Sequence, residues 1–128
     1  MNPEEFVSEV SKRSKATYSD IELVPRMKEI HQYLASLASK LDNQNTSNTL
    51  TVSSNGFYTI VGVSFSGNEI TFNRTDDSIN VIFKSSNANA FPFQSDTLTI
   101  INNELVSSTT LLTSVDNILK EYLPFLLS

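Results

Sequence analysis

The side chain best suited to proton transfer near neutral pH is histidine, and this chain has a single one, His31. His31 lies one helical turn from Met27 and Leu34, at the boundary of an apolar face. No cysteine is present, and no second ligand type is spaced to share a metal ion with His31. We therefore expect an ordinary boundary residue, with no metal site and no cofactor.

The carboxylates and serines give no stronger catalytic signal. Asp76 and Asp77 fall in a segment with hairpin-turn chemistry, where aspartate is favoured because it hydrogen-bonds the local backbone. The motif around Ser64, "GVSFSG", lacks the glycine that a nucleophile elbow needs two residues after the serine. The three glycines are too widely spaced to cradle a phosphate. We expect no catalytic residues and a non-enzymatic protein; the alternative is an enzyme that uses His31 with a carboxylate.

The first 42 residues read as two helices. Asn2, Pro3 and Glu5 have the spacing of a helix start, and this helix should run to about residue 16. The second should span about 20–42, either with a bend at Pro25 or with its stable part starting at Val24 and Pro25 in the favoured first position.

The second helix carries an apolar seam that repeats at intervals of three and four residues. Its length, two heptads, is short for a coiled coil, so packing against a sheet is the simpler interpretation. The alternative is a homodimer through this seam, which comprises Met27, Ile30, Leu34, Leu37 and Leu41.

After residue 48 the apolar period changes from 3.6 to 2, which indicates strands. Short turns between them favour antiparallel pairing of neighbours. We expect strands at 49–53, 57–65, 69–73, 78–84, 96–101 and 104–107. The face toward the helices should carry Leu50, Val52, Val61, Val63, Ile70, Phe72, Ile79, Val81, Phe83, Leu98 and Ile100.

The last helix should start near Thr113, which has capping-box spacing to Asp116, and Pro124 should end or kink it. The chain closes with "FLLS", whose apolar side chains dock either on the protein's own core or on another molecule. The sequence thus predicts one α+β domain over 1–128. Two N-terminal helices (1–42) and a C-terminal helix (110–128) pack in two layers on an antiparallel meander sheet of five or six strands (49–107).

Two surfaces could bind a partner protein. On the outer face of the predicted sheet, Tyr58, Ile60 and Ile82 could line up across strands, with Ile101 at the margin, and a contiguous apolar patch marks a contact site. The alternative is a sheet face half covered by a chain terminus.

The second surface is the long segment 85–96, which holds Phe91 and Phe93 around Pro92. Long loops in compact domains are often functional, and aromatic residues often anchor interfaces. In the alternative interpretation the two rings plug the end of the core.

The net charge is −5, of which residues 49–128 carry −4, and this acidity disfavours nucleic acid as a partner. The start of the chain does not resemble a signal peptide, and no apolar run is long enough to cross a membrane, so we expect a cytoplasmic location without membrane insertion. We expect a protein-interaction module, either an acidic complex subunit or a small inhibitor of the immunity type. The alternative is a small-molecule or lipid-binding domain, with an apolar pocket near His31 and Tyr33 between sheet and helices.

Overall fold

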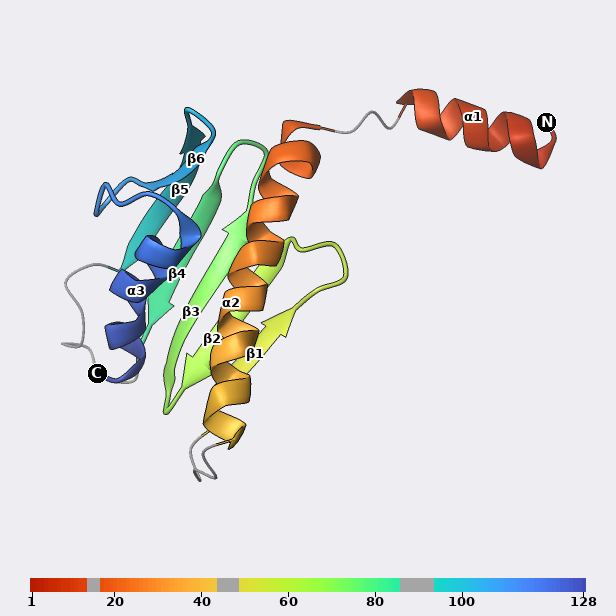
Figure 1. Ribbon diagram of the computed structural model, residues 1–128. Coiled ribbons are helices and arrows are strands. Elements are labelled where there is room, and N and C mark those ends of the chain that lie inside the picture. The colour runs from red at the N-terminus through yellow and green to blue at the C-terminus, as the bar shows by residue number, and fades with distance from the viewer. Residues whose placement is uncertain (14–16, 44–48, 86–93) are drawn as a thin grey trace.

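The computed structural model describes residues 1–13, 17–43, 49–85 and 94–128 (Figure 1). Its helices are α1 (Pro3–Arg13), the π-helical turn η1 (Ser19–Leu23), α2 (Val24–Asn43) and α3 (Val115–Leu126). Its strands are β1 (Thr51–Ser54), β2 (Ile60–Phe65), β3 (Asn68–Arg74), β4 (Ile79–Lys84), β5 (Ser95–Ile101) and β6 (Glu104–Ser107). The predicted α+β class, the six strands and the C-terminal helix are confirmed.

The strands form one antiparallel meander in the order β1-β2-β3-β4-β5-β6. Helix α2 packs on β1, β2 and β3, while α3 packs on β3 and β6, and the two helices touch each other. Both lie on the same face of the sheet (Figure 1). The opposite face therefore carries no helix in the described part of the chain.

The core lies between this sheet and the two helices. The inward strand residues predicted from alternation are buried, with Phe72, Val81 and Leu98 fully so, whereas Leu50, Val52 and Ile100 are half-buried at its margin. From the helices, Leu23, Met27, Ile30 and Leu34 of η1 and α2 join Ile118, Leu119 and Tyr122 of α3.

This burial removes three residues of the α2 seam from the surface that the predicted homodimer would use. Met27, Ile30 and Leu34 are at most 1% exposed, because the protein's own sheet covers them. Only Leu37 and Leu41, at the far end of the seam, keep part of their surface exposed.

The helix starts follow local rules. The side chain of Asn2 accepts a hydrogen bond from the Glu5 amide at 2.7 Å, as the capping prediction requires. Before Pro25 the chain is already helical, but it winds as the wider η1 turn. Proline lacks the amide hydrogen that an α-helical turn would use there, which suits a change of hydrogen-bond pattern.

Helix α1 does not pack on the sheet, contrary to the expectation of two N-terminal helices against it. It projects from the start of η1 and α2, away from the body (Figure 1). The apolar residues of α1, Phe6, Val7 and Val10, are 60%, 62% and 43% exposed.

Candidate binding groove

The predicted outer-face patch is not contiguous, and Tyr58 does not belong to it. Residues 55–59 form a loop and not the start of β2, because the Asn55 side chain accepts hydrogen bonds from the Thr59 and Ile60 amides, at 2.8 Å and 3.4 Å. Tyr58 has a φ of 53° in this loop. Its ring contacts His31 edge-on at 5.9 Å, and the Lys28 ammonium lies 5.6 Å from the ring centre, so Tyr58 packs on the helix side.

Ile60 and Ile82 do lie on the outer face, at 45% and 41% exposure. The strand register pairs Ile60 with Asn73 and Ile82 with Thr71, so polar residues of β3 stand between the two isoleucines. Ile101 lies six residues beyond Ser95, the β5 partner of Ile82, or about 20 Å along the strand. These side chains are isolated from one another.

The aromatic pair Phe91 and Phe93, with most of the segment 85–96, lies outside the described residues. Their assignment to a partner surface stays a prediction.

Among the described residues, His31 belongs to no metal-binding group. Within the described residues, no three histidine or acidic side chains are grouped so as to hold a metal ion. His31 faces the β1–β2 loop through Tyr58, whereas Tyr33 is close enough to Lys120 of α3 for an electrostatic interaction. The two residues point to different sides of α2, so they do not line one pocket as expected.

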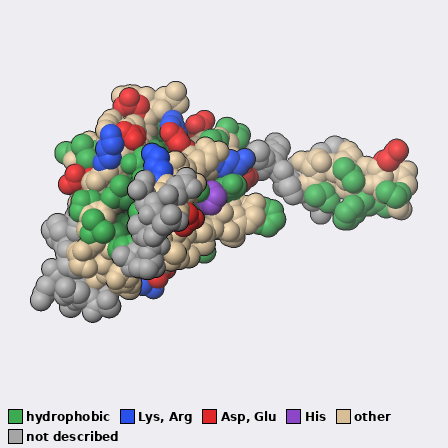
Figure 2. Space-filling view, turned by 60° about the horizontal axis from the view of Figure 1, so that its bottom comes forward, with side chains coloured by type: hydrophobic (Ala, Val, Ile, Leu, Met, Phe, Trp, Pro, Cys, Tyr) green, Lys and Arg blue, Asp and Glu red, His purple; other side chains and the backbone are tan. Residues whose placement is uncertain are grey.

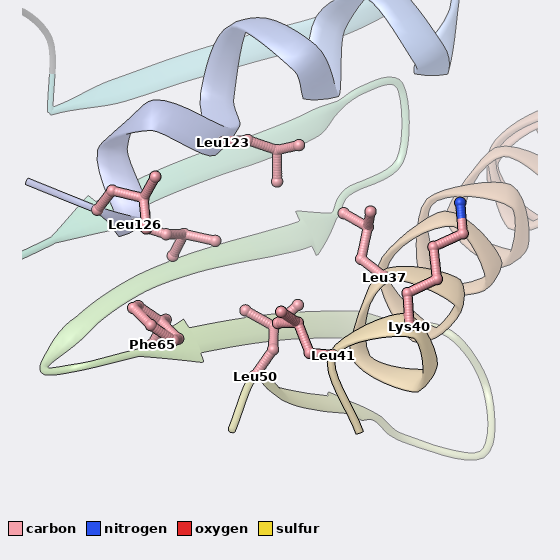
Figure 3. A pocket seen from close by; sticks show the side chains of 8 residues that line it. Leu37, Lys40, Leu41, Leu50, Phe65, Leu123 and Leu126 are labelled. Carbon is pink, nitrogen blue, oxygen red and sulfur yellow. The ribbon is translucent and has the colours of Figure 1, made fainter. Parts of the chain in front are cut away.

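An apolar groove lies instead at the other end of α2, between α2 and α3 (Figure 3). Its volume is about 340 Å³. The floor and walls are apolar apart from Lys40, whose side chain stands on the α2 side. The lining residues are Leu37, Lys40 and Leu41 of α2, Leu50 ahead of β1, Phe65 of β2, and Leu123, Leu126 and Leu127 of the C-terminal segment.

The α2 wall of the groove is the end of the apolar seam. Leu37 and Leu41 continue the spacing of Ile30 and Leu34, but here they keep part of their surface exposed. The sequence signalled these leucines as apolar. It did not show that the sheet would cover the first three seam residues more completely than the last two.

The opposite wall depends on the chain end, which docks on the core. Phe125 and Leu126 are only 3% exposed, whereas Leu127 is 78% exposed. Buried Asn68 holds this segment, because its side-chain amide donates to the carbonyl oxygens of Phe125, Leu126 and Ser128 at 3.3, 3.2 and 2.8 Å. Asn68 was not expected to matter, since a strand asparagine gives no sequence signal for so distant a contact.

The structure also buries a polar cluster that the sequence did not indicate. The Asp96 carboxylate accepts hydrogen bonds from the hydroxyls of Ser107 and Tyr122 and from the amides of Thr97 and Thr109, the last two at 2.7 Å and 3.0 Å. Asp96 is 5% exposed, and Ser107 and Tyr122 are fully buried. The cluster joins β5, β6 and α3.

The hydrogen bonds of this polar cluster stabilise the folded protein. Burial alone would raise the pKa of Asp96, but the hydrogen bonds from Ser107, Tyr122 and Thr109 outweigh burial and hold that pKa below its ordinary value of 3.8. Burial, with the hydrogen bond to Asp96, raises the pKa of Tyr122 well above its ordinary value of 10.0. The carboxylate is thus charged and the phenol neutral at physiological pH, and all three side chains are shielded from solvent.

Comparison with known proteins yields no match among protein-family models, curated proteins or solved structures. In the described ranges, no helix is both long enough and apolar enough to span a membrane.

Proposed function

We propose that this protein is a non-enzymatic binding module, whose groove between α2 and α3 receives an apolar helical segment of another protein. The observation that carries the proposal is the groove itself, with seven apolar side chains and one ammonium group around about 340 Å³. An amphipathic helix that lays its apolar side chains into such a groove is a recurring mode of peptide recognition. Both roles expected from the sequence, complex subunit and small inhibitor, suit such a module.

The shape of the groove favours a protein segment over a small ligand. Small-molecule sites usually enclose most of the ligand and present several polar groups that fix its orientation. Among the described residues that line this groove, Lys40 alone offers a charged group, and the others are apolar (Figure 3). The expected partner carries bulky apolar residues on one helix face and an acidic residue beside them.

Titration with designed amphipathic peptides tests the proposal. A peptide about four turns long, with leucines at helical spacing and flanking glutamates, should bind saturably and shift the NMR amide signals of Leu37, Leu41 and Leu123. The double variant Leu41→Gln/Leu127→Gln should weaken binding about tenfold or more, because it puts polar groups on both walls.

The matched control is Ile82→Gln, which places the same side chain on the outer face of the sheet and should leave peptide binding unchanged. Peptides that never shift these signals, or that bind the double variant as well as the parent, would overturn the proposal.

A second candidate is binding of a small apolar acid, and the position of Lys40 favours it. An ammonium at the edge of an apolar hollow could pair with a carboxylate whose alkyl chain fills the groove, and the volume is within the range of small-ligand sites. Lauric acid should then shift the same NMR signals, and Lys40→Gln should weaken its binding. If lauric acid binds and no peptide does, this candidate replaces the first.

A further inference from the structure

Helix α1 and the groove are two apolar surfaces that no other described segment of the chain covers. Phe6, Val7 and Val10 of α1 fall within one third of the helix circumference, since they occupy positions i, i+1 and i+4. Figure 2 shows α1 as an arm that stands apart from the body, with hydrophobic side chains exposed along it. A short helix of this kind gains most of its stability from packing its apolar stripe on something else.

Even fully stretched, the chain's own α1 reaches no further than the near end of the groove. Val10 and Phe6 lie at most about 22 Å and about 28 Å from Tyr18, even with the connecting residues fully stretched. Along the helix axis, Leu37 lies about 29 Å and Leu41 about 35 Å from Tyr18. In its own molecule the stretched arm brings only Phe6 to the near end of the groove and leaves Val10 short of it, whereas α1 of another molecule can fill the groove along its length.

The chemistry of α1 fits the partner that the groove requires. Its stripe supplies one aromatic and two branched apolar side chains, and Glu4 lies beside Val7 on the helix surface. Lys40 lies at the edge of the groove, where it can meet such a carboxylate. Opposite charges at the rim of an interface favour the correct register of the two partners.

We propose that the groove binds α1 of a second copy of this chain, in a reciprocal exchange of arms. This inference rests on the proposed function, because it names the occupant of the same groove. When two copies are related by a two-fold axis with their α2 helices antiparallel, the start of one α2 lies beside the end of the other. Each arm then reaches the partner's groove over a short distance, and the contact is made twice.

Molar mass measured by light scattering over a concentration series tests the exchange. The mass should rise from 14.2 kDa toward twice that value. The double variant Phe6→Ser/Val10→Ser should raise the dimer dissociation constant about a hundredfold, because it removes apolar anchors from two contacts. Ser8→Gln, on the opposite side of α1, is the matched control and should leave the constant unchanged.

Reversing the charges of Lys40 and Glu4 tests the register in which α1 lies in the partner's groove. Lys40→Glu should weaken the dimer about tenfold, and adding Glu4→Lys should restore most of the lost affinity. Because α1 does not pack on the sheet, the α1 variants should keep the melting temperature of the parent at concentrations where both are monomeric.

A chain that stays at 14.2 kDa up to about millimolar concentration overturns the inference. So does a dimer that the α1 variants leave intact. If the designed leucine peptides still bind the groove of such a chain, the proposed function stands and only the identity of the occupant is wrong. If those peptides also fail to bind, both proposals fall.

Discussion

At the scale of single residues, the most consequential side chain is the buried carboxylate of Asp96. Four hydrogen-bond donors surround it, and its charged form is the one they stabilise. Because the pKa of Asp96 is lower in the folded protein than in the unfolded chain, its stabilisation is present above the ordinary value of 3.8. That stabilisation disappears as the pH falls through the folded pKa.

We expect Asp96→Asn to lower the free energy of unfolding at neutral pH by about 1–3 kcal/mol, since an amide cannot accept from all four donors. The variant should also lose less stability than the parent between about pH 5 and about pH 3. Urea unfolding at both pH values measures this. Asp76→Asn, in the exposed β3–β4 turn, is the control. An acid dependence identical in parent and Asp96→Asn would contradict the prediction.

The stabilisation that Tyr122 contributes depends on pH in the opposite direction. Its raised pKa means that the folded state holds the phenol proton more tightly than the unfolded chain does. The resulting stabilisation is complete below the ordinary value of 10.0 and is lost as the pH rises above it.

We therefore expect Tyr122→Phe to flatten the loss of stability between about pH 8 and about pH 11, and to cost about 1–3 kcal/mol at neutral pH by removing a donor from Asp96. Guanidinium unfolding at the two pH values tests this. Tyr18→Phe, at a half-exposed ring, should leave the alkaline slope unchanged. If the free energy of unfolding falls equally with pH in the parent and in Tyr122→Phe, the buried phenol contributes nothing to the alkaline loss of stability.

At the scale of elements, Arg74 at the end of β3 joins three segments. Its guanidinium donates to the carbonyl oxygens of Phe57 and Tyr58 at 3.0 Å and 3.1 Å, and to the Ser19 hydroxyl at 2.8 Å. It also lies 3.6 Å from the Asp20 carboxylate. The β1–β2 loop and the start of η1 are thereby held against the sheet.

A lysine at this position keeps the charge but cannot reproduce the planar set of donors. Arg74→Lys should lower the free energy of unfolding by about 1–3 kcal/mol and speed amide hydrogen exchange at Tyr58 and Thr59. Lys84→Arg, at an exposed position of β4, is the control for replacing one basic side chain by the other. Unchanged exchange in this loop would show that Arg74 does not hold it.

At the scale of the whole molecule, helices cover one face of the sheet, and no described helix covers the other. The isoleucines on the open face are separated by threonine and asparagine, so they form no apolar patch. On the covered face, Phe72 is fully buried between the sheet and α3, with its ring centre 6.2 Å from that of Tyr122.

The double variant Ile60→Thr/Ile82→Thr should change the free energy of unfolding by no more than about 1 kcal/mol, since each exposed substitution costs at most about 0.5 kcal/mol. Phe72→Ala should cost about 3–5 kcal/mol, because it leaves a cavity in the core. Denaturant unfolding of the three proteins compares the two faces. A large loss in the isoleucine variant would mean that the open face is covered in solution.

Much of the fold follows from short-range spacing. The period of two in β3 and β4, and the turn residues between them, specify antiparallel strands with Ile70, Phe72 and Val81 inward, because alternation and turn chemistry act within a few residues. The repeat of three and four in α2 specifies its buried stripe in the same way. Tyr58 was misplaced because the Asn55 side chain closes a loop where alternation alone would continue a strand.

Tertiary structure decided which surfaces remain open. The groove brings together Leu41, Phe65 and Leu127, and the polar cluster brings together Asp96, Ser107 and Tyr122. These contacts depend on where the two helices pack on the sheet, and no local periodicity of the sequence encodes that position. Residue type and spacing along the chain establish which residues are apolar and how each element forms. Only the packed molecule decided which of those residues its own sheet would cover, since burial depends on contacts between segments far apart in the chain.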